Sequence, residues 1–312
     1  KKLNLKPNQK VLDIGSGWGS LAIEIAKKSQ CEVLGVTLSE NQYKYSIEKA
    51  KAHLPRLEAI GGSSAGVFVD NRPRVASLFR GISESDFTER ISPLFIELGK
   101  SLEVPLSIIN DGEVTALAAS MSLERNAVLG IAMGTSEATG YVDPKGRVTS
   151  WLNELAFAPV DYSSTAPADE WSGDVGCGAQ YFSQQAVGRL IPKTGLPIDP
   201  ALGLPEKLEC LQGLMAEGSP EASSVYRTIG TYLGYGVAHY ASFYSLSHAL
   251  ILGRVTTGEG GAVILEEAEK VLAEEFPELD EKIAFHQPDE KNKRHGQAIA
   301  AASLPATGQT QS

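Results

Sequence analysis

The chain has 312 residues, of which 42% are hydrophobic and 21% charged, and its formal net charge is −10 at pH 7. This length and composition predict a globular protein that buries a sizeable core, and its size favours a division into two lobes. The negative charge argues against nucleic acid or an anionic membrane as the main partner.

Cysteine usage and hydropathy indicate the compartment. The cysteines are odd in number and widely spaced, at Cys31, Cys177 and Cys210. This pattern excludes a disulfide framework and indicates a reducing environment, so we expect a cytoplasmic protein. No apolar run reaches the roughly 18 residues that cross a membrane, and no signal peptide is visible, so we expect no membrane span.

The first fifty residues have the pattern of one β-α-β unit followed by a further helix. The apolar run Lys10–Ile14 predicts a buried strand, and alternating glycines follow it at residues 15–19. Apolar residues at helical spacing come next, then a second predicted strand, Glu32–Val36, and a polar helix, Glu40–Ala52. Glycines between a strand and a helix let backbone N–H groups approach a ligand.

The full sequence of this unit is a more specific signal than its glycine pattern alone. Val-Leu-Asp-Ile-Gly-Ser-Gly-Trp-Gly at 11–19 and Leu-Gly-Val-Thr-Leu-Ser-Glu-Asn-Gln at 34–42 resemble S-adenosylmethionine-dependent methyltransferases, most closely the cyclopropane fatty acid synthase group. The resemblance implies S-adenosylmethionine as a cofactor, with contacts from Asp13, Gly15, Gly17, Thr37 and Gln42. It stops near residues 50–56, before the further strands of a complete domain. We therefore expect a partial Rossmann-like β-α-β-α unit over residues 1–54.

A second interpretation of the glycine turn stays open. Asp13-Ile14-Gly15 could begin a phosphate-binding Asp-x-Gly hairpin, which requires an antiparallel strand directly after the glycines. Residues 21–28 have helical rather than alternating periodicity, so the β-α-β interpretation is favoured.

The central part of the chain predicts alternating strands and helices with polar residues at the strand ends. Residues 59–67 predict a strand that runs into a turn of small residues. The buried strand Leu106–Ile109 stops at Asn110-Asp111-Gly112, and a helical pattern follows over Glu113–Glu124. A second buried strand, Val128–Met133, ends at Gly134-Thr135-Ser136 before the chain returns. In open α/β sheets ligands bind at such strand ends.

The C-terminal part continues this alternation. A long helical pattern covers Ala222–Leu246, a buried strand covers Ala249–Leu252, and a second helix covers Ala262–Glu275. A glycine turn separates the strand from the second helix, and residues 306–312 are expected to be a disordered tail. One apolar stripe runs along the first helix through Val225, Ile229, Leu233, Val237 and Tyr240.

In this order and spacing the segments from about residue 55 to residue 305 resemble the sugar kinases of the actin-like ATPase superfamily, in particular ROK-type and hexokinase-like members. The resemblance implies an α/β fold with ribonuclease H-like lobes and ATP-dependent phosphoryl transfer to a hexose-type hydroxyl. A small-molecule sugar and ATP with Mg²⁺ are the implied ligands, and a homodimer is left open. The implied catalytic base is Asp111, the sugar contacts are Asn110, Glu113 and Glu154, and the ATP contacts are Gly134, Thr135, Gly253, Gly258 and Gly260.

Several positions depart from the family pattern. Ser136 and Ala138 replace hairpin glycines, and Phe157 replaces the histidine of the sugar segment. Only Cys177 remains where many ROK proteins carry a cysteine-rich zinc site, so we expect no metal there. The family's first phosphate loop should precede residue 57, but the methyltransferase-like segment stands in its place. The chain is therefore predicted to be composite, and a natural fusion and an artificial join near residues 50–57 are both compatible with it.

Structural alternatives remain for the site residues. Asp111 is also a preferred type of helix N-cap, and Gly134-Thr135 could be an ordinary tight turn. Three functions follow from the sequence: a sugar kinase with weakened transfer, a fragment of an S-adenosylmethionine-dependent methyltransferase, and a non-catalytic sugar-binding module.

Overall fold

The computed structural model describes residues 10–14, 32–36, 59–64, 66–75, 79, 81–101, 103–149, 151–170, 172–288 and 296–307. Two compact units divide the chain, unit 1 with residues 1–122 and 290–312 and unit 2 with residues 123–289. The predicted helices at 21–28 and 40–52, the join at 50–57 and the last five residues of the predicted tail lie outside the described residues. So do Gly15, Gly17, Thr37 and Gln42.

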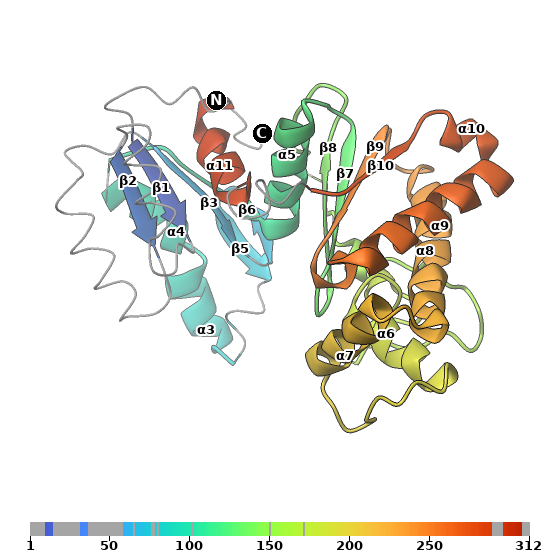
Figure 1. Cartoon of the computed structure of the whole chain (residues 1–312). Helices are drawn as coiled ribbons and strands as arrows, with labels where there is room; N and C mark the ends of the chain where they lie inside the picture. The colour runs from blue at the N-terminus through green and yellow to red at the C-terminus, as the bar shows by residue number, and fades with distance from the viewer. Residues whose placement is uncertain are drawn as a thin grey trace. The chain divides into compact units, whose positions relative to one another are not determined.

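Unit 1 contains a parallel sheet of order β2-β1-β3-β6 (Figure 1). The parallel pairing of β1 with β2 fits the β-α-β interpretation, because a hairpin would pair them antiparallel. β1 also joins β3, with Asp13 opposite Gly61. The strands of the methyltransferase-like segment therefore belong to the same sheet as the strands of the kinase-like segment. Their bounds are β1 Lys10–Ile14, β2 Glu32–Val36, β3 Ile60–Ser64 and β6 Leu106–Asn110.

A short hairpin follows β3 and leads into helices. Its strands β4 (Val67–Val69) and β5 (Arg72–Val75) are antiparallel. Asp70 and Asn71 between them have φ angles of 51° and 60°, the left-handed conformation that tight hairpin turns require and that Asn and Asp tolerate. The remaining elements of unit 1 are α3 Glu84–Asp86, a π-helical turn Phe87–Ile91, α4 Leu94–Ser101, α5 Asp111–Leu123, α11 Gly296–Ser303 and the 3-10 turn Leu304–Thr307.

Helix α11 closes unit 1 from far along the sequence. It lies against β3 and β1, as the red helix beside the blue strands of Figure 1 shows. A Cβ atom on Gly61 would lie 1.9 Å from the carbonyl oxygen of Ala301, so only glycine fits this contact. Ala300, Ala301 and Leu304 are buried there.

Unit 2 is built on a mixed sheet of order β10-β9-β7-β8. β7 pairs antiparallel with β8, whereas β9 pairs parallel with both β7 and β10. The strands are β7 Val128–Met133, β8 Glu137–Val142, β9 His248–Leu252 and β10 Ala284–His286. The α-helices are α6 Gln184–Leu190, α7 Leu204–Ala216, α8 Pro220–Tyr240, α9 Glu259–Glu275 and α10 Pro277–Asp280, with 3-10 turns at Leu155–Phe157, Gly178–Gln180, Ile191–Lys193 and Arg254–Thr256.

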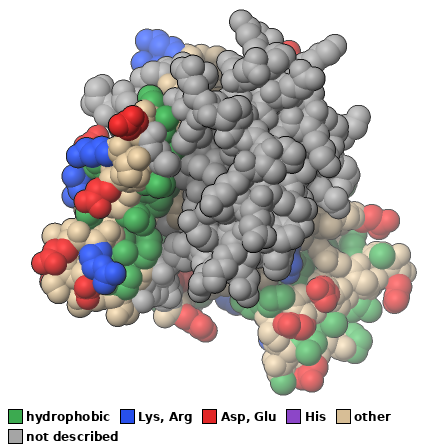
Figure 2. Space-filling model, turned by 90° about the vertical axis from the view of Figure 1, so that its left-hand side faces the viewer, with side chains coloured by type: hydrophobic (Ala, Val, Ile, Leu, Met, Phe, Trp, Pro, Cys, Tyr) green, Lys and Arg blue, Asp and Glu red, His purple; other side chains and the backbone are tan. Residues whose placement is uncertain are grey.

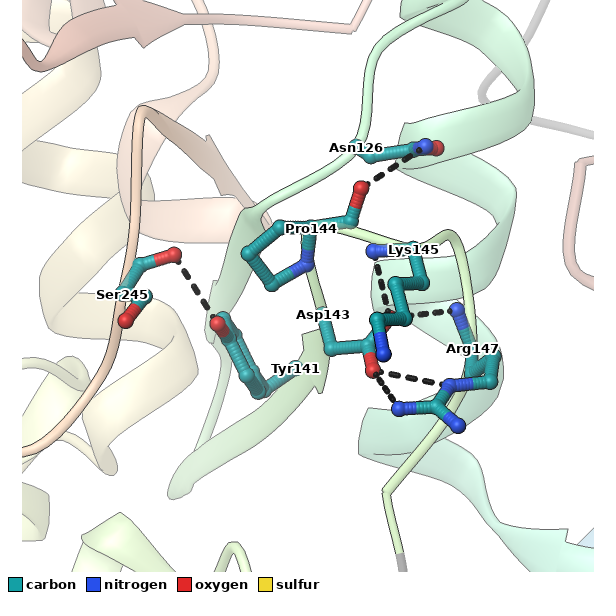
Figure 3. Close-up of polar contacts among 7 residues, drawn as sticks. All are labelled: Asn126, Tyr141, Asp143, Pro144, Lys145, Arg147 and Ser245. Atoms are coloured by element: carbon teal, nitrogen blue, oxygen red, sulfur yellow. Dashed lines mark hydrogen bonds and ion pairs between the residues drawn. The ribbon is translucent and has the colours of Figure 1, made fainter.

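The end of β8 is fixed by one aspartate (Figure 3). Asp143 Oδ1 accepts hydrogen bonds from the backbone N–H groups of Lys145 and Arg147 at 2.8 and 2.9 Å. Its Oδ2 accepts from the Arg147 guanidinium, from Nε at 2.9 Å and from Nη2 at 2.7 Å. Tyr141, in the same strand, donates its hydroxyl to the carbonyl oxygen of Ser245 at 2.9 Å. These bonds anchor the strand that carries the β7–β8 turn at its other end.

The core of unit 2 lies between this sheet and helices α8 and α9. The predicted stripe of α8 is buried at all five positions, from Val225 to Tyr240, with exposed fractions of at most 1%. The two helices approach closely because Gly234 faces Val271, where a Cβ atom would come within 2.6 Å of the valine Cβ. The helical periodicity of the sequence thus reflects a real buried face.

The predicted elements that fall on described residues agree with the structure except at their ends. α5 begins at Asp111 rather than Glu113, and α9 begins at Glu259 because Gly258, with φ 74°, redirects the chain just before it. α8 ends at Tyr240 rather than Leu246, since the chain turns so that Tyr244 and Leu246 are buried. In the described part of the chain no helix is long and apolar enough to span a membrane.

Candidate functional site

The candidate site in unit 1 lies at the carboxyl end of β6. Asn110 is the last residue of this strand and Asp111 the first of α5. The Asn110 amide donates from Nδ2 to the carbonyl oxygen of Gly66 at 2.8 Å, and its Oδ1 accepts from the Gly112 N–H at 2.7 Å. Asp111 Oδ1 accepts from the same N–H at 3.1 Å. The two polar side chains are therefore held by backbone groups.

The β4–β5 hairpin braces the strand that carries this pair. Asn71 donates from Nδ2 to the carbonyl oxygen of Leu106 at 2.9 Å and accepts at Oδ1 from the Ile108 N–H at 2.8 Å. A side-chain amide thus pairs with β6 as another strand would. Sequence reasoning missed Asn71, although the Asp-Asn pair between two short apolar runs was the available signal.

Burial is the largest influence on the pKa of Asp111. The side chain is half-buried, and its burial raises its pKa above the ordinary value, while hydrogen bonds from the Gly112 and Asp111 backbones act to lower it. The positive end of the α5 dipole by itself would lower this pKa. Glu113, a predicted sugar contact, lies in the first turn of α5 and is only 7% exposed.

The predicted phosphate turn of unit 2 joins β7 to β8. Thr135 and Ser136 are exposed and Gly134 is half-buried. The Gly134 carbonyl accepts from the Gln184 N–H at 2.9 Å, and the Gly134 N–H donates to the Ser136 carbonyl at 2.9 Å. The first residue of α6 therefore holds the turn in place.

The three predicted nucleoside glycines have different surroundings. Gly253 has φ 105° and lies so close to β7 that a Cβ would come within 2.5 Å of the Met133 carbonyl oxygen. Gly260 packs against the ring of Tyr226, which a Cβ would approach to 2.4 Å. Gly258 has φ 74°, and no atom of the described residues would touch its Cβ within 4 Å. Packing therefore explains Gly253 and Gly260, whereas Gly258 borders open space.

Glu154 precedes a 3-10 turn in unit 2. Its backbone carbonyl accepts from the Phe157 N–H at 3.1 Å, and its side chain is half-buried. The neighbouring Asn153 is buried and accepts the Tyr244 hydroxyl at 3.0 Å. The segment is thus fixed on one side to the core of unit 2.

Polar side chains cross-link the segment that corresponds to the family's zinc loop. Tyr181 donates its hydroxyl to Asp161, and this bond is the largest of the causes that hold the pKa of Asp161 low. Gln180 and Gln185 bond each other and reach Asp169 Oδ2 at 3.4 Å. Within the residues that the structure describes, no three His, Cys, Asp or Glu side chains gather as metal ligands.

The surface charge in Figure 2 is mixed on the face shown. Lys and Arg side chains alternate with Asp and Glu at the left edge of this view, Asp and Glu predominate at the lower right, and the described residues of this face form no continuous positive surface. The predicted S-adenosylmethionine contacts cannot be placed beside these features, because only the backbone of Asp13, within β1, belongs to the described residues.

Comparison with known proteins separates the chain into two parts. The family model described as mycolic acid cyclopropane synthetase matches residues 1–59. Cyclopropane-fatty-acyl-phospholipid synthase of Escherichia coli strain K12 is 47% identical over 51 residues, which are 16% of this chain and 13% of that enzyme. The S-adenosylmethionine-dependent methyltransferase UmaA of Mycobacterium tuberculosis is 35% identical over 95 residues, 30% of this chain and 32% of UmaA. The chain thus spans only a small part of these relatives.

The fold of most of the chain resembles solved structures of ROK proteins. The ROK hexokinase of Thermus thermophilus superposes with a TM-score of 0.61 at 19% identity, covering 86% of this chain and 88% of that one. A ROK glucokinase of Streptomyces griseus, solved with glucose and AMPPNP, gives 0.58 at 19% identity over 86% and 89%. A ROK transcriptional regulator, a homologue of the E. coli MLC protein, gives 0.63 at 17% identity over 94% and 70%.

These findings define the fold and the character of the first segment. The chain has the actin-like ATPase fold of ROK hexokinases, and its first 59 residues resemble the cyclopropane synthase family. The prediction of a composite α/β chain is confirmed.

Proposed function

We propose that this chain binds a hexose-type sugar and ATP with its Mg²⁺, and transfers the γ-phosphoryl group to a sugar hydroxyl. The observation that carries the proposal is Asp111, a half-buried carboxylate at the carboxyl end of β6 in a fold shared with ROK hexokinases. The glucose and AMPPNP bound to the S. griseus glucokinase support the choice of ligands. The kinase-like region would be residues 55–305, with residues 1–54 as a partial methyltransferase-like unit.

Asp111 would act as the base. The Gly112 N–H occupies Oδ1, so Oδ2 is the oxygen that would accept the proton of the sugar hydroxyl. The hydroxyl oxygen then bonds to the γ-phosphorus as the bond from phosphorus to the β–γ bridging oxygen breaks, and ADP leaves. Because burial raises the pKa of Asp111, this carboxylate binds a proton more readily than an exposed one does.

The other predicted contacts take supporting roles. Asn110, Glu113 and Glu154 would bind sugar hydroxyls, and the turn at Gly134 and Thr135 would receive phosphate oxygens. Among the nucleoside glycines the open surroundings of Gly258 favour ligand contact, with Gly253 and Gly260 shaping the turn around it.

We expect weak transfer. In such kinases the first phosphate loop is an antiparallel hairpin that helps to seat the β- and γ-phosphates. Here the methyltransferase-like segment occupies its place, and its strands β1 and β2 pair in parallel, so they do not form that hairpin. Loss of one preorganised electrostatic contact of about 3 kcal/mol slows a reaction roughly a hundredfold.

A coupled ADP-release assay over hexoses and N-acetylhexosamines tests this function. Turnover should be slow and sugar-dependent, and Asp111→Asn should abolish it while the circular dichroism spectrum is retained. Asp70→Asn, the same change at an exposed turn of unit 1, is the matched control and should keep full turnover. Turnover that Asp111→Asn leaves unchanged would remove Asp111 as the base.

Two other functions have observations of their own. The match of residues 1–59 to the cyclopropane synthetase family supports S-adenosylmethionine binding by an incomplete site. Micromolar binding in calorimetry that Asp13→Ala abolishes would establish it. The shared fold of the ROK regulator supports a non-catalytic sugar-binding module, which sugar binding without any turnover in the ADP assay would identify.

A further inference from the structure

A carboxylate is buried directly beneath the β7–β8 turn. Glu137 is the first residue of β8 and is only 5% exposed. Its Oε1 accepts the Thr139 hydroxyl at 3.0 Å, and its buried Oε2 has no hydrogen-bond partner among the described residues. The next two positions on the same side of the strand, Thr139 and Tyr141, are also buried, and Tyr141 is part of the unit 2 core. Glu137 therefore occupies a position where the strand pattern calls for an apolar residue.

A carbonyl oxygen lies near Oε2, and no positive charge of the described residues acts on Glu137. A Cβ atom on Gly178 would lie 2.2 Å from Glu137 Oε2 and 2.5 Å from the Leu155 carbonyl oxygen, so both oxygens crowd the same small space. Two oxygens so placed repel each other when both are acceptors, whereas a proton on Oε2 removes the repulsion.

Among the described residues, Glu137 acts on the buried Tyr240 of α8, and Tyr244 and Cys177 act on Tyr240 as well. Asp169 and Asp174 in turn act on Cys177. Burial raises the pKa of Tyr240 and of Cys177, so both are neutral at pH 7. No basic side chain of the described residues is among the causes that act on Glu137.

An ionised carboxylate is very unfavourable in such a place. Burying a charge without a counter-charge costs so much that the group takes up a proton instead. Consistent with this, burial raises the pKa of Glu137 to about 8, and the Thr139 hydroxyl only partly offsets it.

We propose that Glu137 is a neutral carboxylic acid that positions the β7–β8 turn for phosphate, and that its ionisation in alkaline solution weakens nucleotide binding. The inference rests on the proposed function. Glu137 pairs with Met133 across the base of the turn, and its side chain is buried beside the strand ends that carry Gly134 and Thr135. A neutral acid adds no repulsion to an incoming phosphate, whereas a carboxylate does so through a medium of low dielectric.

The first test measures the Kd of Mg·ATP between pH 6.5 and 9.5. In the wild type the Kd should be constant at neutral pH and rise about tenfold per pH unit above pH 8, because one proton must be taken up for binding. Glu137→Gln, an isosteric and permanently neutral side chain, should bind as well at pH 7 and lose this rise. Glu269→Gln, the same change on the exposed face of α9, should follow the wild type.

A second variant predicts a shift rather than a loss. Thr139→Val removes a hydrogen bond that favours the ionised form, so the midpoint of nucleotide release should move to higher pH. Equal profiles in the wild type and Glu137→Gln, or a midpoint that Thr139→Val leaves in place, would overturn the inference.

Unfolding without nucleotide separates this inference from the proposed function. The raised pKa means that the folded state holds a proton that the unfolded state releases above about pH 4.5. The folding equilibrium constant of the wild type, relative to Glu137→Gln, should therefore fall about tenfold per pH unit from pH 4.5 to 8 and level off above. A flat ratio refutes the neutral acid. Absence of wild-type Mg·ATP binding at pH 7 refutes the proposed function and the nucleotide part of this inference.

Discussion

Asn71 offers a direct test of how the hairpin positions the candidate site. In Asn71→Gly both side-chain bonds to β6 are lost, which leaves the N–H of Ile108 and the carbonyl of Leu106 without these partners. Ile108 is 2% exposed, so water replaces the lost bond poorly. An unsatisfied buried group costs about 1–3 kcal/mol, and we expect a loss of about 2–4 kcal/mol for the pair.

Glycine is the sharper replacement because it keeps the turn. Asn71 has φ 60°, which glycine adopts freely and alanine does not. Asn71→Ala should therefore cost roughly 1 kcal/mol more than Asn71→Gly. The difference between the two variants isolates the backbone strain, and Asn71→Gly by itself isolates the hydrogen bonds.

Hydrogen exchange at the Ile108 amide measures the effect where it occurs. A loss of about 2–4 kcal/mol corresponds to exchange that is roughly 30- to 1,000-fold faster. Sugar affinity should fall with it, since β6 carries Asn110 and Asp111 at its end. Asp70→Gly, a change in the same turn without bonds to β6, should leave Ile108 protected. If Asn71→Gly leaves the exchange of Ile108 unchanged, the hairpin does not brace the strand.

Two further predictions concern unit 2. His248 Nδ1 and His286 Nε2 share a hydrogen bond of 3.0 Å, and burial lowers the pKa of both side chains. Their contribution to stability is therefore present above pH 6.5 and is lost as the pH falls through the pKa values of the folded state. The unfolding free energy of the wild type relative to His286→Asn should accordingly decrease from pH 7 to 5, and a constant difference would contradict this. Gly234→Ala places a Cβ 2.6 Å from that of Val271, so it should lower the free energy of unfolding in urea by about 1–3 kcal/mol. Gly213→Ala, in α7, has no described atom within 4 Å of the new Cβ and should raise the same free energy by about 0.5–1 kcal/mol. Equal effects of the two glycine changes would show that α8 and α9 do not pack tightly at this point.

Local sequence was sufficient for the elements whose pattern is set by one buried face. The stripe of α8 and the apolar runs of β6, β7 and β9 were predictable because helices and strands repeat their buried positions at fixed intervals. The parallel pairing of β1 and β2 followed from helical rather than alternating spacing between them. The composite character of the chain was also predictable from local sequence, because each part keeps the sequence motifs of the family that it resembles.

Tertiary structure alone decided the direction of the pKa shifts and the supporting contacts. The electrostatics of Asp111 depend on burial, which sequence position at a helix N-terminus does not reveal. Asn71 and Leu106, 35 positions apart, meet only because the hairpin folds against β6. Glu137 reads as a surface residue in a strand, and the packing of Gly178 and Tyr240 around it makes it a buried acid. A pattern records which face of an element is apolar, whereas desolvation and long-range hydrogen bonds depend on what the fold places against that face.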